Sequence, residues 1–369
     1  MTRARLRDLG VTIGNYPTGT YNAITDVPGV LVGHETIISD EGRTARTGVT
    51  TIVPREGTIW SDHAFAGYFS FNGCGEMTGL PWVAEAGLIH TPIAITNTNS
   101  VGVVRDALCA YPLEIASSFE VPPSIASSWS GSLPVVGETW DGWLNDIEAF
   151  HVTREHAFRA LKAAHTGAVA EGNVGGGTGM ICHEFKGGIG TSSRIVKYAH
   201  ASYTVGVLVQ ANYGSRNLLS IGGVPVGREL DFSQIASPWI EPPKGGSIIV
   251  VVATDAPLIP VQCQRLARRA TVGLARVGGV GSNGSGDIFI AFATGNHLPV
   301  GSQSPIDLQM LPHDHMDPII EAVAEATEES ILNALTAADT MVGYKGRTVY
   351  GLPLDEVTRV MRKYRPSAM

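Results

Sequence analysis

The stretch Gly245–Gly246–Ser247 places a hydroxyl residue directly before an apolar run, Ile-Ile-Val-Val-Val-Ala. A serine hydroxyl is a weak nucleophile unless a neighbouring base accepts its proton. The α-amine of an N-terminal residue can be that base, because it titrates near neutral pH. Ser247 is internal, so this chemistry requires that the peptide bond between Gly246 and Ser247 breaks first.

Self-cleavage would break this bond if the Ser247 hydroxyl attacked the carbonyl carbon of Gly246 and water then released the ester. Gly246 suits such an attack because it has no Cβ to obstruct it. The apolar run would hold the new N-terminus rigidly. However, a Gly-Gly-Ser turn before a buried strand is common, so the tripeptide alone favours an ordinary turn.

The elements around this junction are indicated by the hydrophobic pattern. Apolar runs of strand length recur between glycine-rich loops, at residues 29–37, 48–54, 91–98, 203–214, 247–254 and 287–295. Residues 257–279 and 317–339 have helical periodicity. We expect Pro260 in the first turn of the former helix, and we expect the latter to be amphipathic with Asp317 as its cap. Alternating strands and helices predict an α/β (α+β) layered fold.

Composition limits the class of protein. The chain has 369 residues, of which 44% are hydrophobic and 16% charged, and its formal charge is −8. This balance argues against partners such as nucleic acid or an anionic membrane. The four cysteines have no CxxC spacing, and no apolar window is long enough for a membrane span or a signal peptide. We therefore expect a cytoplasmic protein that folds as one domain over residues 1–369, with Ser237–Gly246 as the only plausible linker.

Several other motifs invite different chemistry. The glycine loops at 172–180 and 278–287 lack the GK[ST] of a phosphate-binding loop and a complete GxGxxG pattern, which favours turns that line a pocket. His313, Asp314 and His315 could suggest a metal, but no third-ligand motif lies nearby, so a solvated loop before a helix is expected. Glu76 and Cys74 could be catalytic by type, and a structural role is favoured for Glu76.

Long motifs in order along the chain resemble the family of L-aminopeptidase/D-esterase (D-amidase) and β-aminopeptidase enzymes, which are self-processing hydrolases with an N-terminal serine. The motifs are NAITDVPGVLVGHETI (22–37), RTGVTTIVP (46–54), FNGCGEMTGLPWVAEAGLIHTPIAITNTNSVGVVRDAL (71–108), EGNVGGGTGM (171–180) and GGSIIVVVATDAPL (245–258).

The resemblance implies a precursor that cuts itself into an α chain, 1–246, and a β chain, 247–369. It implies a four-layer αββα sandwich, with layers like those of the N-terminal-nucleophile hydrolases and the connectivity of ornithine acetyltransferase. It also implies a homotetramer that needs no metal or other cofactor, and substrates that are small peptides, amides or esters with a free N-terminal amine.

Carried over by position, the resemblance makes Ser247 the nucleophile and Asn212 of VQANYG a donor to the oxyanion. Ser285 and Asp287 of GSNGSGD match a serine–acid pair that would orient the α-amine and hydroxyl of Ser247. Some relatives have glutamate at the second of these places.

In GETWDGW, Glu138 and Trp140 match the wall of the active site, and Glu138 would bind the ammonium group of the substrate. Some relatives carry tyrosine in place of Trp140, and an indole cannot accept a hydrogen bond as a phenol can.

Two alternatives remain open. An acyltransferase of the ornithine acetyltransferase type would pass the acyl group to an amine instead of water, although that family uses threonine as its nucleophile. An uncleaved relative that only binds ligands would keep the chain intact.

Overall fold

The computed structural model describes residues 3–56, 59–116, 133–230, 235–239 and 245–365, and it contains two main β-sheets. The larger sheet has the order β4-β3-β12-β11-β10-β9, and the smaller sheet has the order β1-β2-β5-β6. The strands of the larger sheet are β3 (Asp62–Ser70), β4 (Leu88–Ile89), β9 (Gly188–Lys197), β10 (Ser202–Asn212), β11 (Gly246–Thr254) and β12 (Ser285–Pro299). Those of the smaller sheet are β1 (Leu31–Ser39), β2 (Ala45–Val53), β5 (Ile93–Asn97) and β6 (Val135–Thr139).

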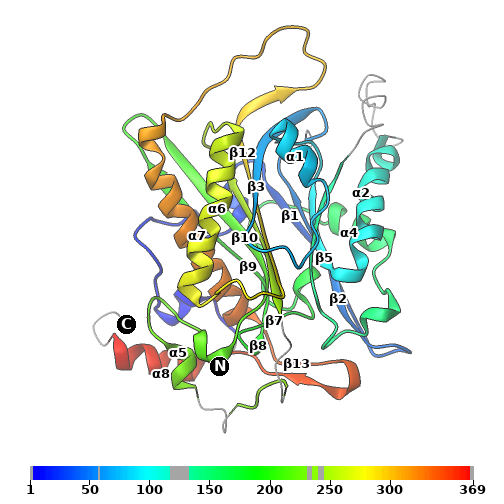
Figure 1. Ribbon diagram of the computed structural model, residues 1–369, viewed down its shortest axis with the longest axis vertical. Helices are drawn as coiled ribbons and strands as arrows, with labels where there is room; N and C mark the ends of the chain where they lie inside the picture. Colours follow the sequence, from blue (N-terminus) through cyan, green and yellow to red (C-terminus); the bar gives the residue numbers. More distant parts are fainter. Residues whose placement is uncertain (1–2, 57–58, 117–132, 231–234, 240–244, 366–369) are drawn as a thin grey trace.

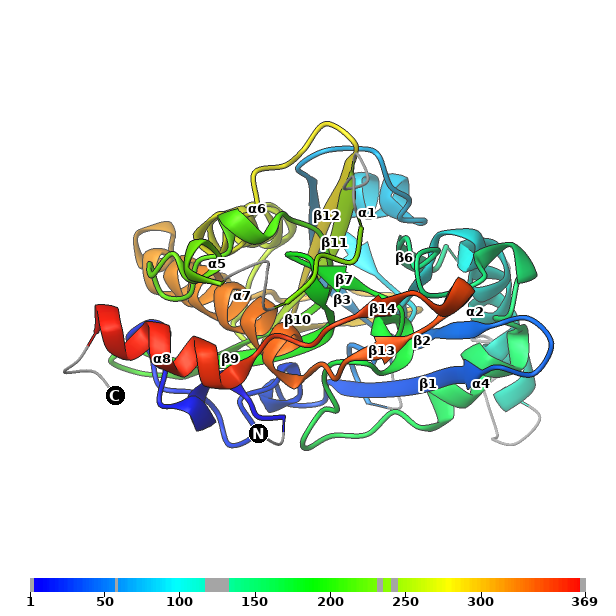
Figure 2. The ribbon, with the colours of Figure 1, turned by 90° about the horizontal axis from the view of Figure 1, so that it is seen from below.

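Helices and two short hairpins complete the described part of the chain. The helices are α1 (Leu80–Ala86), α2 (Val101–Ala116), α4 (Arg154–Lys162), α5 (Val226–Glu229), α6 (Pro260–Val277), α7 (Asp317–Ala337) and α8 (Leu354–Tyr364). The hairpins pair β7 (Ile181–Cys182) with β8 (Phe185–Lys186), and β13 (Met341–Val342) with β14 (Thr348–Val349). Figure 2 shows α8 and the β13–β14 hairpin running across one end of the molecule.

The two sheets face each other, and helices cover their outer faces. Figure 1 shows α6 and α7 beside the six-stranded sheet and α2 and α4 beside the four-stranded sheet. Alternate residues of β11 point to opposite faces of the sheet and pack into two different hydrophobic cores. Ile249 and Val251 join the core between the sheets, whereas Ile248 and Val250 join the core under α6 and α7. Burial of both faces explains why the run after Ser247 is apolar at every position.

The expected mixed α/β class is confirmed, and all six apolar runs contain a strand. The first helix begins at Pro260 as expected, and Gly278 follows its end with a left-handed backbone (φ 110°). The residue that precedes α7 is Met316, so Asp317 lies in the first turn instead of capping the helix. Residues 240–244 of the expected linker lie outside the described residues.

The expectation that α7 is amphipathic is wrong, because its residues from Ala322 to Thr336 are all buried. The helix is covered by β9 and β10 on one side and by α6 on another. Its carboxylates Glu325 and Glu329 are paired with the fully buried Arg194, at 3.0 Å and 2.7 Å. A helix buried on most sides can carry such charges only when they are paired in this way.

No helix within the described residues is long and apolar enough to cross a membrane.

Candidate active site

Ser247 is the second residue of β11, between two strands whose register places specific neighbours beside it. It pairs with Asn212 on antiparallel β10 and with Gly286 on parallel β12. The side chain is buried, with 6% exposure. With the bond between residues 246 and 247 intact, its Oγ donates a hydrogen bond to the Gly246 carbonyl (2.6 Å) and accepts one from the Gly286 N–H (3.3 Å). The hydroxyl is therefore held against the peptide group that precedes it.

Asn212 lies directly opposite Ser247, so the two side chains share one face of the sheet. Its amide orientation is determined by two backbone groups. Oδ1 accepts a hydrogen bond from the N–H of Ile181 (2.8 Å), and Nδ2 donates to the carbonyl of Trp140 (2.9 Å). A primary amide has two N–H bonds. The second N–H of Nδ2 has no acceptor among the described residues, which makes it a donor for an incoming oxygen.

Ser285 and Asp287 form the expected pair, with the Ser285 hydroxyl donating to Oδ1 of Asp287 at 2.6 Å. Asn72 completes the cluster, since its Nδ2 donates to Oδ2 of Asp287 (3.1 Å) and its Oδ1 accepts from the Asp287 N–H (2.7 Å). Burial raises the pKa of Asp287, and the bonds from Ser285 and Asn72 partly oppose that rise. The shorter aspartate thus reaches its serine partner.

These two side chains do not lie on the same face of the sheet as the Ser247 hydroxyl. In the parallel register Ser285 pairs with Gly246 and Asp287 with Ile248, and alternation directs both away from the side that carries Ser247. Within the described residues, no hydrogen bond joins either one to Ser247. They lie beside the backbone of Gly246 and Ile248, on the opposite face of the sheet from the Ser247 hydroxyl.

Glu138 on β6 enters the site from the other sheet. Its side chain is buried, with 3% exposure. Oε1 accepts the N–H of Glu76 (2.9 Å), and Oε2 accepts the hydroxyl of Thr98. A Cβ on Gly75 would lie 3.3 Å from Oε1 of Glu138 and 2.9 Å from Cα of Gly286, so this loop packs between Glu138 and the strand beside Ser247. Burial raises the pKa of Glu138, and the hydrogen bonds from Thr98 and Glu76 oppose the rise.

Trp140 contributes through its backbone. Its carbonyl holds Asn212, whereas its indole is 43% exposed and packs over Gly142.

Sequence reasoning missed Asn72, Thr98 and Lys186. Asn72 lies inside the FNGCGEM motif, but nothing in its local pattern indicates a contact with Asp287, 215 residues away. Lys186 is fully buried in the β7–β8 hairpin, and its Nζ donates to three backbone carbonyls. A single lysine between Phe185 and two glycines gives no signal of its burial.

The other motifs that could suggest chemistry, at residues 313–315 and at Cys74 and Glu76, lie on the surface of the protein. His313, Asp314 and His315 form an exposed turn before α7. No group of three side chains suited to a metal ion occurs in the part of the chain that the structure describes. Glu76 and Cys74 are exposed, and Glu76 contributes its backbone N–H to Glu138.

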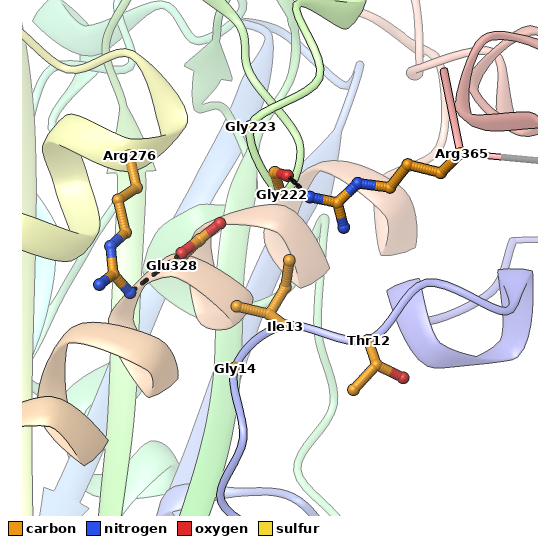
Figure 3. A pocket seen from close by; sticks show the side chains of 8 residues that line it. All are labelled: Thr12, Ile13, Gly14, Gly222, Gly223, Arg276, Glu328 and Arg365. Atoms are coloured by element: carbon orange, nitrogen blue, oxygen red, sulfur yellow. Dashed lines mark hydrogen bonds and ion pairs between the residues drawn. The ribbon is translucent and has the colours of Figure 1, made fainter. Parts of the chain in front are cut away.

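A pocket of about 390 Å³ lies elsewhere, between the N-terminal segment around Ile13 and the helices α6 and α7 (Figure 3). Its arginines already have partners. Arg276 pairs with Glu328 at 3.5 Å, and Arg365 donates to the carbonyl of Gly222. None of the residues around Ser247 lines it, so we assign the chemistry to the Ser247 site.

Comparison with known proteins shows the family of this chain. Residues 22–349 match the family described as Peptidase family S58. The β-peptidyl aminopeptidase BapA of Sphingosinicella microcystinivorans is 47% identical over 380 residues, which cover 98% of this chain and 92% of that protein. A solved β-aminopeptidase from Burkholderia sp. is 50% identical with a TM-score of 0.89, over 98% of this chain and 99% of that one.

The L-aminopeptidase D-Ala-esterase/amidase of Ochrobactrum anthropi has a TM-score of 0.88 and 42% identity, over 98% of each chain. Its structure is described as a prototype for the serine aminopeptidases and as a new variant of the Ntn hydrolase fold. The chain therefore belongs to peptidase family S58 and is a serine aminopeptidase.

Proposed function

We propose that this aminopeptidase activates itself by cutting the bond between Gly246 and Ser247, and that Ser247 is then its N-terminal nucleophile. The observation that carries the proposal is the position of the Ser247 hydroxyl, 2.6 Å from the carbonyl oxygen of Gly246 and at the buried start of β11. Attack on the Gly246 carbon would move the acyl group from nitrogen to oxygen. Water would then hydrolyse the ester and leave chains 1–246 and 247–369.

In the mature enzyme, the free α-amine of Ser247 would accept the hydroxyl proton as Oγ attacks the substrate carbonyl. The protonated amine would then donate that proton to the leaving amine, and water would release the acyl group in the reverse sequence. Ser285 and Asp287 lie beside the backbone of residues 246–248. We assign them to orient the new α-amine.

Asn212 would stabilise the negative oxygen of the tetrahedral intermediates through the N–H of Nδ2 that has no acceptor among the described residues. A donor that is already oriented costs no reorganisation during the reaction, and one such donor is worth about 10²–10³ in kcat. The two backbone contacts of Asn212 provide this orientation.

Glu138 would bind the ammonium group of the substrate, which limits the enzyme to unblocked N-termini. Its burial makes an unpaired charge costly, so a cation would be favoured there. Small peptides, amides and esters with a free N-terminal amine are the substrates that we propose.

Intact-mass measurement and N-terminal sequencing of the purified protein test the processing step. Two chains with the second starting Ser-Ile-Ile-Val are expected, and Ser247→Ala should remain at full length. A wild-type chain that stays intact for days while it hydrolyses aminoacyl anilides would refute the mechanism. Release of p-nitroaniline from aminoacyl anilides, with and without an added acceptor amine, separates hydrolysis from acyl transfer. We expect hydrolysis, so the added amine should give no new amide product.

We propose that the facing sheets with helices outside form the four-layer αββα sandwich with the connectivity of ornithine acetyltransferase.

We further propose a homotetramer. The segment between β12 and α7 loops outward in Figure 1 and exposes Ile306, Leu308 and Met310. Light scattering on the processed protein should give four times the mass of one αβ unit, and replacement of these three residues by serine should lower it.

A further inference from the structure

Lys186 is a fully buried lysine that the aminopeptidase mechanism leaves without a role. Its Nζ donates to the carbonyls of Met180 (2.7 Å), Gly187 (2.7 Å) and Gly177 (3.3 Å). Three acceptors match the three N–H bonds of an ammonium group, whereas a neutral amine would leave one of them unpaired. Burial lowers the pKa of Lys186 to about 7, and the neighbouring Cys182 and Asp141 oppose that fall.

The contact with Met180 leads directly to the oxyanion donor. The carbonyl that Lys186 binds and the N–H of Ile181 belong to the same peptide group. That N–H donates to Oδ1 of Asn212 at 2.8 Å. The series therefore runs from the ammonium through one peptide unit to the side-chain amide of Asn212, which lies opposite Ser247.

Each unit in this series polarises the next. A cation at a carbonyl oxygen makes the N–H of the same amide a stronger donor, and an amide whose oxygen accepts a strong bond has more acidic N–H groups. The effect is larger away from water, and Met180 and Lys186 are both fully buried. The Nδ2 of Asn212 thus becomes a stronger donor for negative oxygen than an isolated amide.

We propose that Lys186 is a positioning and polarising residue, which strengthens Asn212 as an oxyanion donor through the peptide group of Met180 and Ile181. The proposal rests on the oxyanion role given to Asn212 in the proposed function. Lys186 does not touch the substrate. Its contribution should therefore be present in the transition state and small in the bound ground state, where the carbonyl carries little charge.

The size of the effect follows from two magnitudes. One oxyanion donor is worth about 10²–10³ in kcat, and hydrogen bonds in a chain strengthen one another by about 10–30% each. If 10–30% of the free energy of that donor depends on the charge of Lys186, removal of the charge lowers kcat roughly two- to eightfold and leaves KM unchanged.

The test is a double-mutant cycle on the processed enzyme, with Lys186→Gln, Asn212→Ala and both together. Glutamine keeps two N–H donors for the carbonyls and removes the charge and the third donor. Activity is expressed per processed molecule, counted by intact mass, so slower maturation does not enter kcat. We expect Lys186→Gln to lower kcat two- to eightfold in the native background and by less than a factor of two beside Asn212→Ala.

Two further variants separate charge from packing. Lys186→Arg keeps the cation and should retain kcat within about a factor of two, and Lys197→Gln removes an exposed charge from β9 and should change nothing. If Lys186→Gln does not fold, Lys186→Met repeats the cycle with a side chain of similar length. If neither folds, the lysine serves stability and the proposal is overturned.

The outcomes distinguish this proposal from the proposed function. If Asn212→Ala alone leaves kcat unchanged, the oxyanion role of Asn212 is wrong, and the proposed relay fails with it. If Asn212→Ala lowers kcat strongly but Lys186→Gln acts equally in both backgrounds, the proposed function stands and the relay alone is refuted. An effect of Lys186→Gln on KM without kcat would also refute the relay.

Discussion

Replacement of Gly246 by alanine should slow the proposed self-cleavage, because the added methyl group meets the backbone next to the neighbouring strand. A Cβ at this position would lie 2.9 Å from Cα of Tyr213, 3.1 Å from its Cβ and 3.1 Å from the carbonyl oxygen of Asn212. Carbon atoms attract best at about 3.5–4.0 Å, so β11 would have to move away from β10 by roughly 0.5–1 Å. Such overpacking costs about 1–3 kcal/mol.

The displacement matters for rate because the attacking hydroxyl belongs to the next residue. A misplacement of about 1 Å can cost on the order of 10²-fold in a reaction that depends on alignment. We therefore expect Gly246→Ala to process at least about tenfold more slowly than the native chain. Molecules that do mature should have native kcat, since Ser247 and its α-amine are unchanged.

The assay follows full-length chain and the two products by intact mass after synthesis, together with anilide hydrolysis per mature molecule. Gly102→Ala is the matched control, because Gly102 is exposed in α2 and its Cβ would contact nothing within 4 Å. That change should leave processing untouched and stabilise the helix by roughly 0.5–1 kcal/mol. Native processing rates in Gly246→Ala would show that tight packing beside the scissile bond is not required.

Two further predictions concern buried charges. Thr98→Val removes a hydrogen bond that lowers the pKa of Glu138, so the pKa of this carboxyl should rise. The acid limb of the pH profile of kcat/KM should then move to higher pH. An unmoved limb would mean that Glu138 does not need its charge for binding. Arg194→Met removes the buried partner of Glu325 and Glu329, although Glu329 keeps its pairing with Arg7. We expect a loss of about 3–5 kcal/mol in urea unfolding of the Ser247→Ala chain, and a loss under 1 kcal/mol would show that Arg194 is not needed to hold these carboxylates.

The strands and their order along the chain could be predicted because their cause is local. A run such as Ile248–Ala253 is apolar at every position, and this pattern is typical of a strand covered on both faces. Pro260 and Gly278 mark the ends of α6 through their own backbone preferences. The resemblance supplied Ser247 and Asn212 as a pair, and the register of β10 and β11 places them side by side.

Helix α7 shows where local pattern fails. Its glutamates indicate a solvated face, but β9, β10 and α6 cover the helix, and Arg194 from β9 pairs with two of those glutamates. Arg194, β9 and β10 all lie more than a hundred residues before the glutamates they surround, and α6 lies about 50 residues before them. Periodicity in one segment contains no information about them.

The sequence by itself determined the serine at the start of a buried strand, the alternation of strands and helices, and the family. Only the tertiary structure decided which groups surround that serine: the two backbone contacts that orient Asn212, the bonds of Asn72 to Asp287, and the buried Lys186 behind the peptide of Ile181. The physical reason is that apolar patterning and backbone preference act within a few residues. Hydrogen bonds among buried polar groups depend on strand register and on sheet packing, which bring together residues that are far apart in the chain.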